Sequence, residues 1–545
     1  MRHLLSIFSY LSVLVHGLSL VLQTVLIGST GFVFFVLRPA ERQVDESTEN
    51  IELRIRSLLF WIALALALVQ LVYAICNGLI LMSTAGLHFS EIVGAQFVIA
   101  SGSIIVLSLI LAAISHYCFS FWRAMIPATG ILIASVATSH AWSRVECRTA
   151  LSIFDFVHQA GVGIWIGALP SLLIALSAAT QPQTATKVAK RFSQIAVIAV
   201  AVVFVAGLDL SFSYFDKLDA VYGTAYGIML LSKVALFLVL LAVGAMNKSI
   251  VERLSSNLPR LFELLRRNIE VEIGIGLTVV LAAASLTSQP PAIDLRNDRL
   301  TINELESRYA PRWPRFWSPD VAQLKVPDRQ ILKKEAEKEG RPTTYVPGSP
   351  PLEPETPEGK AWSEYNHNWA GLVIFILGVL AIASRSKNLG WARHWPLAFI
   401  GLAAFIFFRA DPENWPLGPN GFWESFLEAD VLQHRFFALL ILAFAVFEWR
   451  VQTGRGRRDQ YSFVFPAVCA LGGALLFTHS HSLGNVKDET LIEWSHMALA
   501  FLAVIAGWSR WAELRSLPQE KNFLAWVWSI CFALIGTVLM LYRES

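Results

Sequence analysis

Residues 193–215 read SQIAVIAVAVVFVAGLDLSFSYF, a stretch in which Asp209 is the only charged side chain. About 20 mainly apolar residues in a helix cross the hydrocarbon core of a bilayer, so this stretch predicts a transmembrane helix. In the whole chain of 545 residues, 55% are hydrophobic and 16% are charged, against roughly 25% charged in soluble domains. This composition excludes a soluble enzyme, a secreted disulfide scaffold and a disordered chain. The net charge of +3 gives no indication of a nucleic-acid partner. Membrane lipid is expected to surround the chain.

Thirteen further apolar runs resemble this one in length and composition, so the fold predicted is an all-α polytopic membrane protein with about 14 transmembrane helices. The first run is too long for a signal peptide and has no clear cleavage site, so it is counted as a span. The fourteen runs cover residues 11–38, 57–84, 93–115, 117–138, 151–179, 193–215, 224–246, 269–288, 366–384, 395–409, 430–449, 461–478, 491–511 and 523–542.

The distribution of Lys and Arg between the connections predicts the orientation of the chain. Four connections are rich in Lys and Arg, namely 180–192, 247–268, 385–394 and 450–460. They alternate with acidic or neutral connections, which places them in the cytoplasm and both chain termini outside. The long Pro-rich and charged segment 289–365 is then a periplasmic linker. It separates an eight-helix block, residues 1–288, from a six-helix, histidine-rich block, residues 366–545.

Nine of the eleven histidines beyond His3 fall on the predicted outer side. Imidazole is the commonest metal ligand in proteins and suits copper, zinc and iron. His479 and His481 end one span, His496 begins the next, and His434 begins the span before them, so these four predict one outer-face site for copper or haem iron. A single helix-end histidine such as His367 is also explained as an interfacial residue.

Two polar residues lie deeper in the predicted bilayer. His158 is about two turns into its span, and Asp209 lies at a similar depth on the next one. Ionisable groups within spans are usually functional, so these two predict a mixed nitrogen and oxygen site for a metal cation. The alternative is a hydrogen bond between them that locks two helices together. Gly161, Gly163 and Gly167 are expected to let a neighbouring helix pack closely.

Other residues narrow the class of protein. Lys233 could pair with Glu270 or Glu272, but a structural role as anchors at the inner membrane face is expected for them. The five cysteines form no CxxC pair and four lie in or beside apolar runs, so no disulfide is predicted. The seven methionines form no MxxM repeat, and no ATP-binding or phosphorylation motif occurs. These features favour a transporter or metal-handling protein over an enzyme.

Several short motifs follow one another between residues 154 and 291. Residues 156–169 read FVHQAGVGIWIGAL, residues 224–233 read TAYGIMLLSK, and residues 265–272 read LRRNIEVE. Together with Arg191-Phe192-Ser193 and Asn247-Lys248, they resemble the copper resistance protein D family. Ala168 departs from the family pattern, which usually has a second glycine there. The block after residue 366 resembles the carboxy-terminal extension of some members.

The resemblance implies a protein of the bacterial inner membrane that handles copper, by uptake from periplasm to cytoplasm or by delivery to cuproproteins. It also implies a periplasmic copper-binding protein as a partner. The alternative from the residues alone is a membrane redox protein that holds a b-type haem near the outer face, with histidines from different helices as axial ligands. An absorption spectrum separates the two functions.

Overall fold

The computed structural model describes most of the chain, and within the described part the secondary structure is helical. One isolated bridge, between Asn414 and Asn420, is the exception among the described residues. The residues described are 2–40, 46–85, 88–254, 259–296, 298–310, 312–321, 324, 356–386, 388–427, 429–454, 460–477, 486–516 and 521–544.

A helix occupies each of the fourteen predicted runs, and eleven helices in the described residues are long and apolar enough to cross a membrane. Phe121–Val136 and Tyr461–Leu476 are shorter apolar helices, and α18 (Ala429–Gln452) covers the remaining run. The count of fourteen spans therefore remains a prediction. The eleven are Leu11–Ala40, Thr48–Met82, Gln96–Tyr117, Arg148–Ala178, Pro182–Tyr214, Ala225–Arg253, Pro259–Asp294, Pro357–Ala383, Gly390–Arg409, Thr490–Arg515 and Phe523–Met540.

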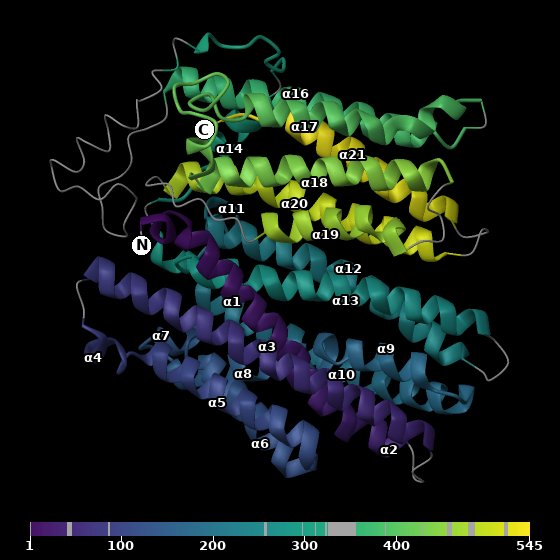
Figure 1. The fold of residues 1–545 in the computed structure, drawn as a ribbon. Coiled ribbons are helices and arrows are strands. Elements are labelled where there is room, and N and C mark those ends of the chain that lie inside the picture. Colours follow the sequence, from purple (N-terminus) through teal and green to yellow (C-terminus); the bar gives the residue numbers. More distant parts are fainter. Residues whose placement is uncertain are drawn as a thin grey trace. The chain divides into compact units, whose positions relative to one another are not determined.

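The chain divides into two compact units. Unit 1 comprises residues 1–9, 221–232 and 296–545, and unit 2 comprises residues 10–220 and 233–295. The predicted boundaries at residues 288 and 366 rest on composition and remain a prediction. Helices α3 (Glu46–Ala85) and α5 (Gln96–Tyr117) lie side by side in unit 2 (Figure 1).

Close contact between backbones holds α1 (Arg2–Gly31) against the segment that follows α8 (Arg148–Val162). A Cβ added at Gly167 would lie 1.9 Å from the Thr24 carbonyl oxygen, and one added at Gly28 would lie 2.2 Å from the Gly163 oxygen. The expectation that Gly163 and Gly167 permit close packing is confirmed. Gly161 faces Val203, at 2.7 Å from an added Cβ. Residues Gly163–Gly167 form a π-helical turn, η2, a local widening often found at functional sites.

The core of unit 1 is aromatic. Trp395, Phe399, Phe465, Trp528 and Phe532 pack together, with ring centroids 5.7–6.4 Å apart. They come from η5 (Gly390–Leu397), α17 (Ala398–Arg409), α19 (Val464–Leu476) and α21 (Lys521–Met540). Such ring pairs bury large apolar areas in offset or edge-to-face arrangements. α16 (Pro357–Ala383) runs alongside α21 (Figure 1).

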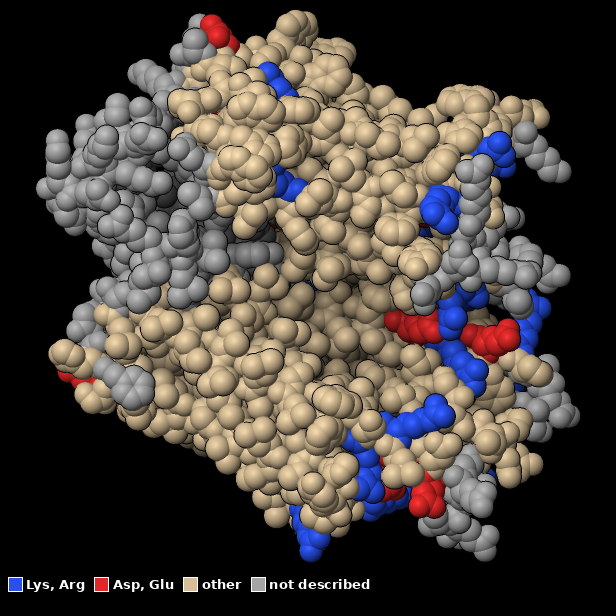
Figure 2. Space-filling view, in the orientation of Figure 1, with Lys and Arg blue, Asp and Glu red and all other residues tan. Residues whose placement is uncertain are grey.

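Large apolar side chains are exposed along the helices rather than buried. Leu68 is 62% exposed, Phe212 75% and Leu439 64%. On the face drawn in Figure 2, residues other than Lys, Arg, Asp and Glu cover most of the described surface. An apolar surface of this extent suits hydrocarbon rather than water.

The orientation of the chain can be tested at the linker, residues 289–365. We expect a Gly340→Cys variant in a background without native cysteines to react with a membrane-impermeant thiol reagent added from the periplasmic side, because the Lys/Arg-rich connections place this segment outside. Labelling that requires disruption of the inner membrane would reverse the topology.

Candidate functional site

Three ionisable side chains lie in the membrane-spanning part of unit 2 and interact electrostatically, and we name Asp155, His158 and Lys233 the first polar layer. Asp155 and His158 lie three residues apart on α8, which puts them on one helix face. Lys233 comes from α12 (Ala225–Arg253) and interacts electrostatically with both. Asp155 is seven residues beyond the start of α8, and Lys233 is eight residues beyond the start of α12. Both helices begin on the predicted outer side, so the two residues lie about 10–12 Å along the helix axis from that side.

The surroundings of His158 hold its imidazole in place. Its Nδ1 lies 3.1 Å from the Val203 carbonyl oxygen on α10 (Pro182–Tyr214). The ring also packs on Gly207, where an added Cβ would lie 3.1 Å from Cε1. Because a carbonyl oxygen only accepts hydrogen bonds, Nδ1 carries the proton and Nε2 carries the lone pair. The imidazole therefore has one nitrogen suited to a metal ion.

A second polar layer lies around Glu272 of α13 (Pro259–Ser288). Trp165 Nε1 donates to one carboxylate oxygen at 2.8 Å, and Asn247 Nδ2 donates to the other at 2.7 Å. The Glu272 residue is only 3% exposed. Its two hydrogen bonds reduce the cost of burying a carboxyl group among apolar helices. Glu272 is thus a buried partner of two other helical segments, where the sequence predicted an anchor at the membrane face.

The two layers follow one face of α12. Lys233 and Asn247 are 14 residues apart, which is nearly four helical turns and about 21 Å. On the α8 side, Trp165 follows His158 by seven residues and lies within the η2 turn. Unit 2 therefore carries ionisable groups at two different depths of a largely apolar bundle, an arrangement typical of ion pathways through membranes.

We expect Glu272→Leu to lower the stability of the protein in detergent, because Trp165 Nε1 and Asn247 Nδ2 would each lose an acceptor at a cost of about 1–3 kcal/mol. Glu272→Gln should cost less, since its amide oxygen satisfies one of the two donors. Thermal unfolding followed by tryptophan fluorescence measures both. Glu263→Gln, at an exposed position of the same helix, is the control; equal melting temperatures for all three would contradict the role of Glu272.

A known protein family matches some of the helices that carry these layers. The model of the copper resistance protein D family matches residues 186–286. Residues 186–286 belong to the copper resistance protein D family. This segment contains Lys233, Asn247 and Glu272, while Asp155, His158 and Trp165 precede it.

A curated relative agrees with this assignment. The copper transport protein CutJ of Bacillus subtilis (strain 168) is 33% identical over 176 residues, which are 32% of this chain and 31% of that protein. The chain thus matches about a third of the length of that relative. No solved structure gives a significant match. The family and the eleven membrane-capable helices among the described residues establish a multi-pass membrane protein.

Near the predicted outer end of the copper resistance D helices, His140 belongs to the short helix α7 (His140–Ser143). Its ring lies 6.5 Å from that of Tyr214. Burial lowers the pKa of His140 below its usual range, while backbone hydrogen bonds at Thr287 and Gln289 oppose the shift. The imidazole is therefore neutral at pH 7, which is the form that binds metal ions.

Asp209 occupies a different face of α10 from the residues that touch His158. Val203 and Gly207 contact the imidazole, and Asp209 is two residues, or about 200° of helical rotation, beyond Gly207. Among the described residues, His158 contacts Val203 and Gly207, and Lys233 acts on it electrostatically. Asp155 is the acidic residue that sequence reasoning missed, although its spacing of three from His158 on one helix was visible. The role of Asp209 as a ligand remains a prediction.

The four histidines predicted as an outer metal site belong to unit 1, and the structure describes two of them. His479 and His481 lie outside the described residues. His434 Nδ1 lies 2.8 Å from Asp411 Oδ1, and His496 is half-buried, one turn after the buried Glu493. Within the described part of the chain, no three His, Cys, Asp or Glu side chains stand at metal-ligand spacing. The four-histidine site remains a prediction.

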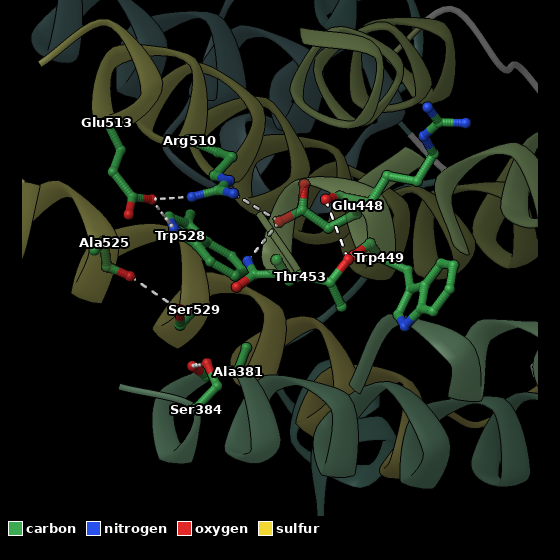
Figure 3. Close-up of polar contacts among 12 residues, drawn as sticks. Ala381, Ser384, Glu448, Trp449, Thr453, Arg510, Glu513, Ala525, Trp528 and Ser529 are labelled. Carbon is green, nitrogen blue, oxygen red and sulfur yellow. Dashed lines mark hydrogen bonds and ion pairs between the residues drawn. The ribbon is translucent and has the colours of Figure 1, made fainter. Parts of the chain in front are cut away.

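Unit 1 also contains a buried ionic network that the sequence analysis missed. Arg510 of α20 (Val486–Arg515) donates to Glu448 of α18 and to Glu513, each at 2.7 Å (Figure 3). Trp528 Nε1 donates to Glu513 at 2.6 Å. The sequence feature that could have revealed this network is the presence of Glu448 and Arg510 within predicted transmembrane runs that are mainly apolar. The network joins three helices, and loss of one partner would leave a buried charge uncompensated.

Proposed function

We propose that the protein carries copper from the periplasm to the cytoplasm of a bacterium, through the inner membrane, by way of the two polar layers of unit 2. The observation that carries the proposal is the position of Asp155, His158 and Lys233 inside the spanning helices that form or adjoin the copper resistance D segment. The name of the curated relative, a copper transport protein, supports the same substrate. The related alternative is delivery of copper to cuproproteins, which would begin with the same capture of the ion by the protein.

The chemistry of the first polar layer suits a copper ion. His158 offers an imidazole nitrogen and Asp155 a carboxylate oxygen, a donor set that copper binds better than an alkali cation does. Lys233 interacts electrostatically with Asp155, and its positive charge lowers the cost of burying the carboxylate.

Outer-face histidines are proposed to collect the ion first. His434, His479, His481 and His496 are the candidates from the sequence, and a periplasmic copper-binding protein is the proposed donor. Neutral imidazole is the ligand, so affinity should fall as the pH drops below about 6.5.

Copper accumulation in cells tests the proposal and separates two versions of the site. Cells expressing the protein should accumulate copper above vector controls, as measured by mass spectrometry of washed cells. We expect Asp155→Asn to abolish the excess and Asp209→Asn to retain it, because Asp155 shares a helix face with His158. The reverse result would favour the His158 and Asp209 site predicted from the sequence. No excess copper with the unaltered protein would contradict transport in this direction.

The haem alternative has its own test. The purified protein should show no Soret band and should contain or bind copper. A Soret band that is lost on replacement of outer-face histidines would instead favour the membrane redox function.

A further inference from the structure

Two tryptophans in the segment between the predicted membrane blocks are almost fully exposed. Trp313 is 97% exposed and Trp317 is 81% exposed. Both belong to residues 312–321, which we name the tryptophan segment, and Arg312 is exposed beside them. The sequence predicted only a periplasmic linker here. Two exposed indole rings four residues apart suit an interfacial environment better than water.

Hydrogen bonds hold the backbone of the tryptophan segment against α16. The Arg315 backbone N–H donates to Asn368 Oδ1 at 2.6 Å, and Trp369 Nε1 donates to the Phe316 carbonyl oxygen at 3.1 Å. The rings of Phe316 and Trp369 also pack together, with centroids 5.4 Å apart. The segment therefore has a defined position along a membrane-capable helix.

The depth of this position follows from the contacts between α16 and α21. Asn368 Nδ2 donates to the Tyr542 carbonyl oxygen at 3.0 Å, and Arg385, just after α16, donates to the Ser529 hydroxyl at 2.8 Å. Asn368 and Arg385 are about 26 Å apart along the helix axis, close to the thickness of the hydrocarbon core, which is about 30 Å. Arg385 lies at the predicted cytoplasmic face, so Asn368 lies near the opposite boundary between hydrocarbon and headgroups.

Positive charge accompanies the tryptophans at this level. Arg308, of α14 (Ile302–Tyr309), is 8% exposed, and its Cζ lies 5.3 Å from the centroid of the Tyr542 ring. Its Nη1 and Nη2 have no hydrogen-bond partner among the described residues. Arg315 pairs with Glu364 at 3.2 Å, which offsets one positive charge. The charges of Arg308 and the exposed Arg312 attract anionic groups such as lipid phosphate.

We propose that the tryptophan segment lies in the headgroup layer of the membrane leaflet on the predicted outer side, with Trp313 and Trp317 at the boundary with the hydrocarbon and Arg312 beside lipid phosphate. Tryptophan is enriched at this boundary because its ring is apolar and its indole N–H donates a hydrogen bond. Arginine binds phosphate oxygens through a planar fork of N–H groups. The segment anchors unit 1 to the membrane surface, a role that is independent of copper.

Spin labels on the full chain measure the depth of the segment. The protein without native cysteines is reconstituted into phosphatidylglycerol vesicles and labelled at Trp313→Cys or Trp317→Cys. Oxygen concentrates in lipid, and a nickel complex present on both sides of the membrane concentrates in water. We expect oxygen to relax both labels more strongly than the nickel complex does. Leu439→Cys, at a position of α18 that is 64% exposed, is the control for hydrocarbon.

Asn303→Cys is the control for water. Asn303 is exposed on α14, and its neighbour Glu304 pairs with Lys487 at the start of α20 at 2.8 Å. Lys487 is 28 residues before the end of α20 at Arg515, about 42 Å along the axis, which is beyond the hydrocarbon. The nickel complex should relax this label more strongly than oxygen does.

The outcomes decide both parts of the proposal. Arg312→Glu should shift the label at residue 317 toward water and Arg312→Lys should keep its depth, because phosphate repels a carboxylate and attracts either cation. An unchanged depth in Arg312→Glu would overturn the phosphate contact. Stronger relaxation by the nickel complex at both tryptophan positions would overturn the membrane contact and favour a periplasmic protein as the partner. These measurements use metal-free protein, so they are unaffected by a failure of copper transport.

Discussion

His158→Gln is expected to abolish copper accumulation while the amount of folded protein in the membrane stays normal. The glutamine amide N–H can donate to the Val203 carbonyl oxygen, which His158 Nδ1 now contacts at 3.1 Å. The contact between α8 and α10 is then preserved. The imidazole nitrogen available to a metal ion is lost, because an amide is a poor ligand for copper by comparison. Copper in washed cells, divided by the amount of protein in the membrane fraction, measures the effect.

The control for this variant is His88→Gln, which removes an exposed imidazole from the same unit and should leave accumulation unchanged. Normal accumulation in a well-expressed His158→Gln variant would leave His158 only its structural contact with Val203. Equal losses in both variants would indicate that the number of histidines matters, and not the position of His158.

Valine at Gly28 or Gly167 is expected to prevent unit 2 from folding. An added Cβ at Gly167 would lie 1.9 Å from the Thr24 carbonyl oxygen, and one at Gly28 would lie 2.2 Å from the Gly163 oxygen. These neighbours are backbone atoms of another helix, so whole helices would have to move apart. Overpacking of a core costs about 1–3 kcal/mol, and contacts with backbone should reach or exceed the upper value. Size-exclusion chromatography in mild detergent measures the folded yield.

Gly102→Val provides a matched control on α5, since no atom lies within 4 Å of a Cβ added there. It introduces the same residue into a spanning helix and should leave the yield normal. A normal yield for Gly28→Val and Gly167→Val would contradict the close contact of α1 with η2.

Hydropathy predicted the helices well because the bilayer imposes one requirement on every span. The length needed to cross hydrocarbon is independent of which helices become neighbours, and a described helix occupies each of the fourteen runs. The glycines near His158 were also informative, since close backbone approach requires residues without a side chain. Membrane spanning and local packing could therefore be inferred without knowledge of the tertiary structure.

Pairings between helices could not be inferred in this way. His158 and Asp209 have similar depths, but depth leaves the rotation of each helix undetermined, and α10 presents Val203 and Gly207 to the imidazole instead. The π-helical turn at Gly163–Gly167 also changes the phase of the residues that follow. Glu272 lies near a predicted membrane face, and only packing of α13 against Trp165 and Asn247 makes it a buried carboxyl group.

The central claim is that the polar layers of unit 2 conduct copper, and transport by the purified chain tests it most directly. The full chain is reconstituted into liposomes, copper is added outside, and the metal retained inside after gel filtration is measured over time. We predict copper entry with the unaltered protein, and entry at the level of protein-free liposomes with His158→Gln. Equal entry into protein-free liposomes and liposomes with the unaltered protein would contradict the claim, as would undiminished entry with His158→Gln.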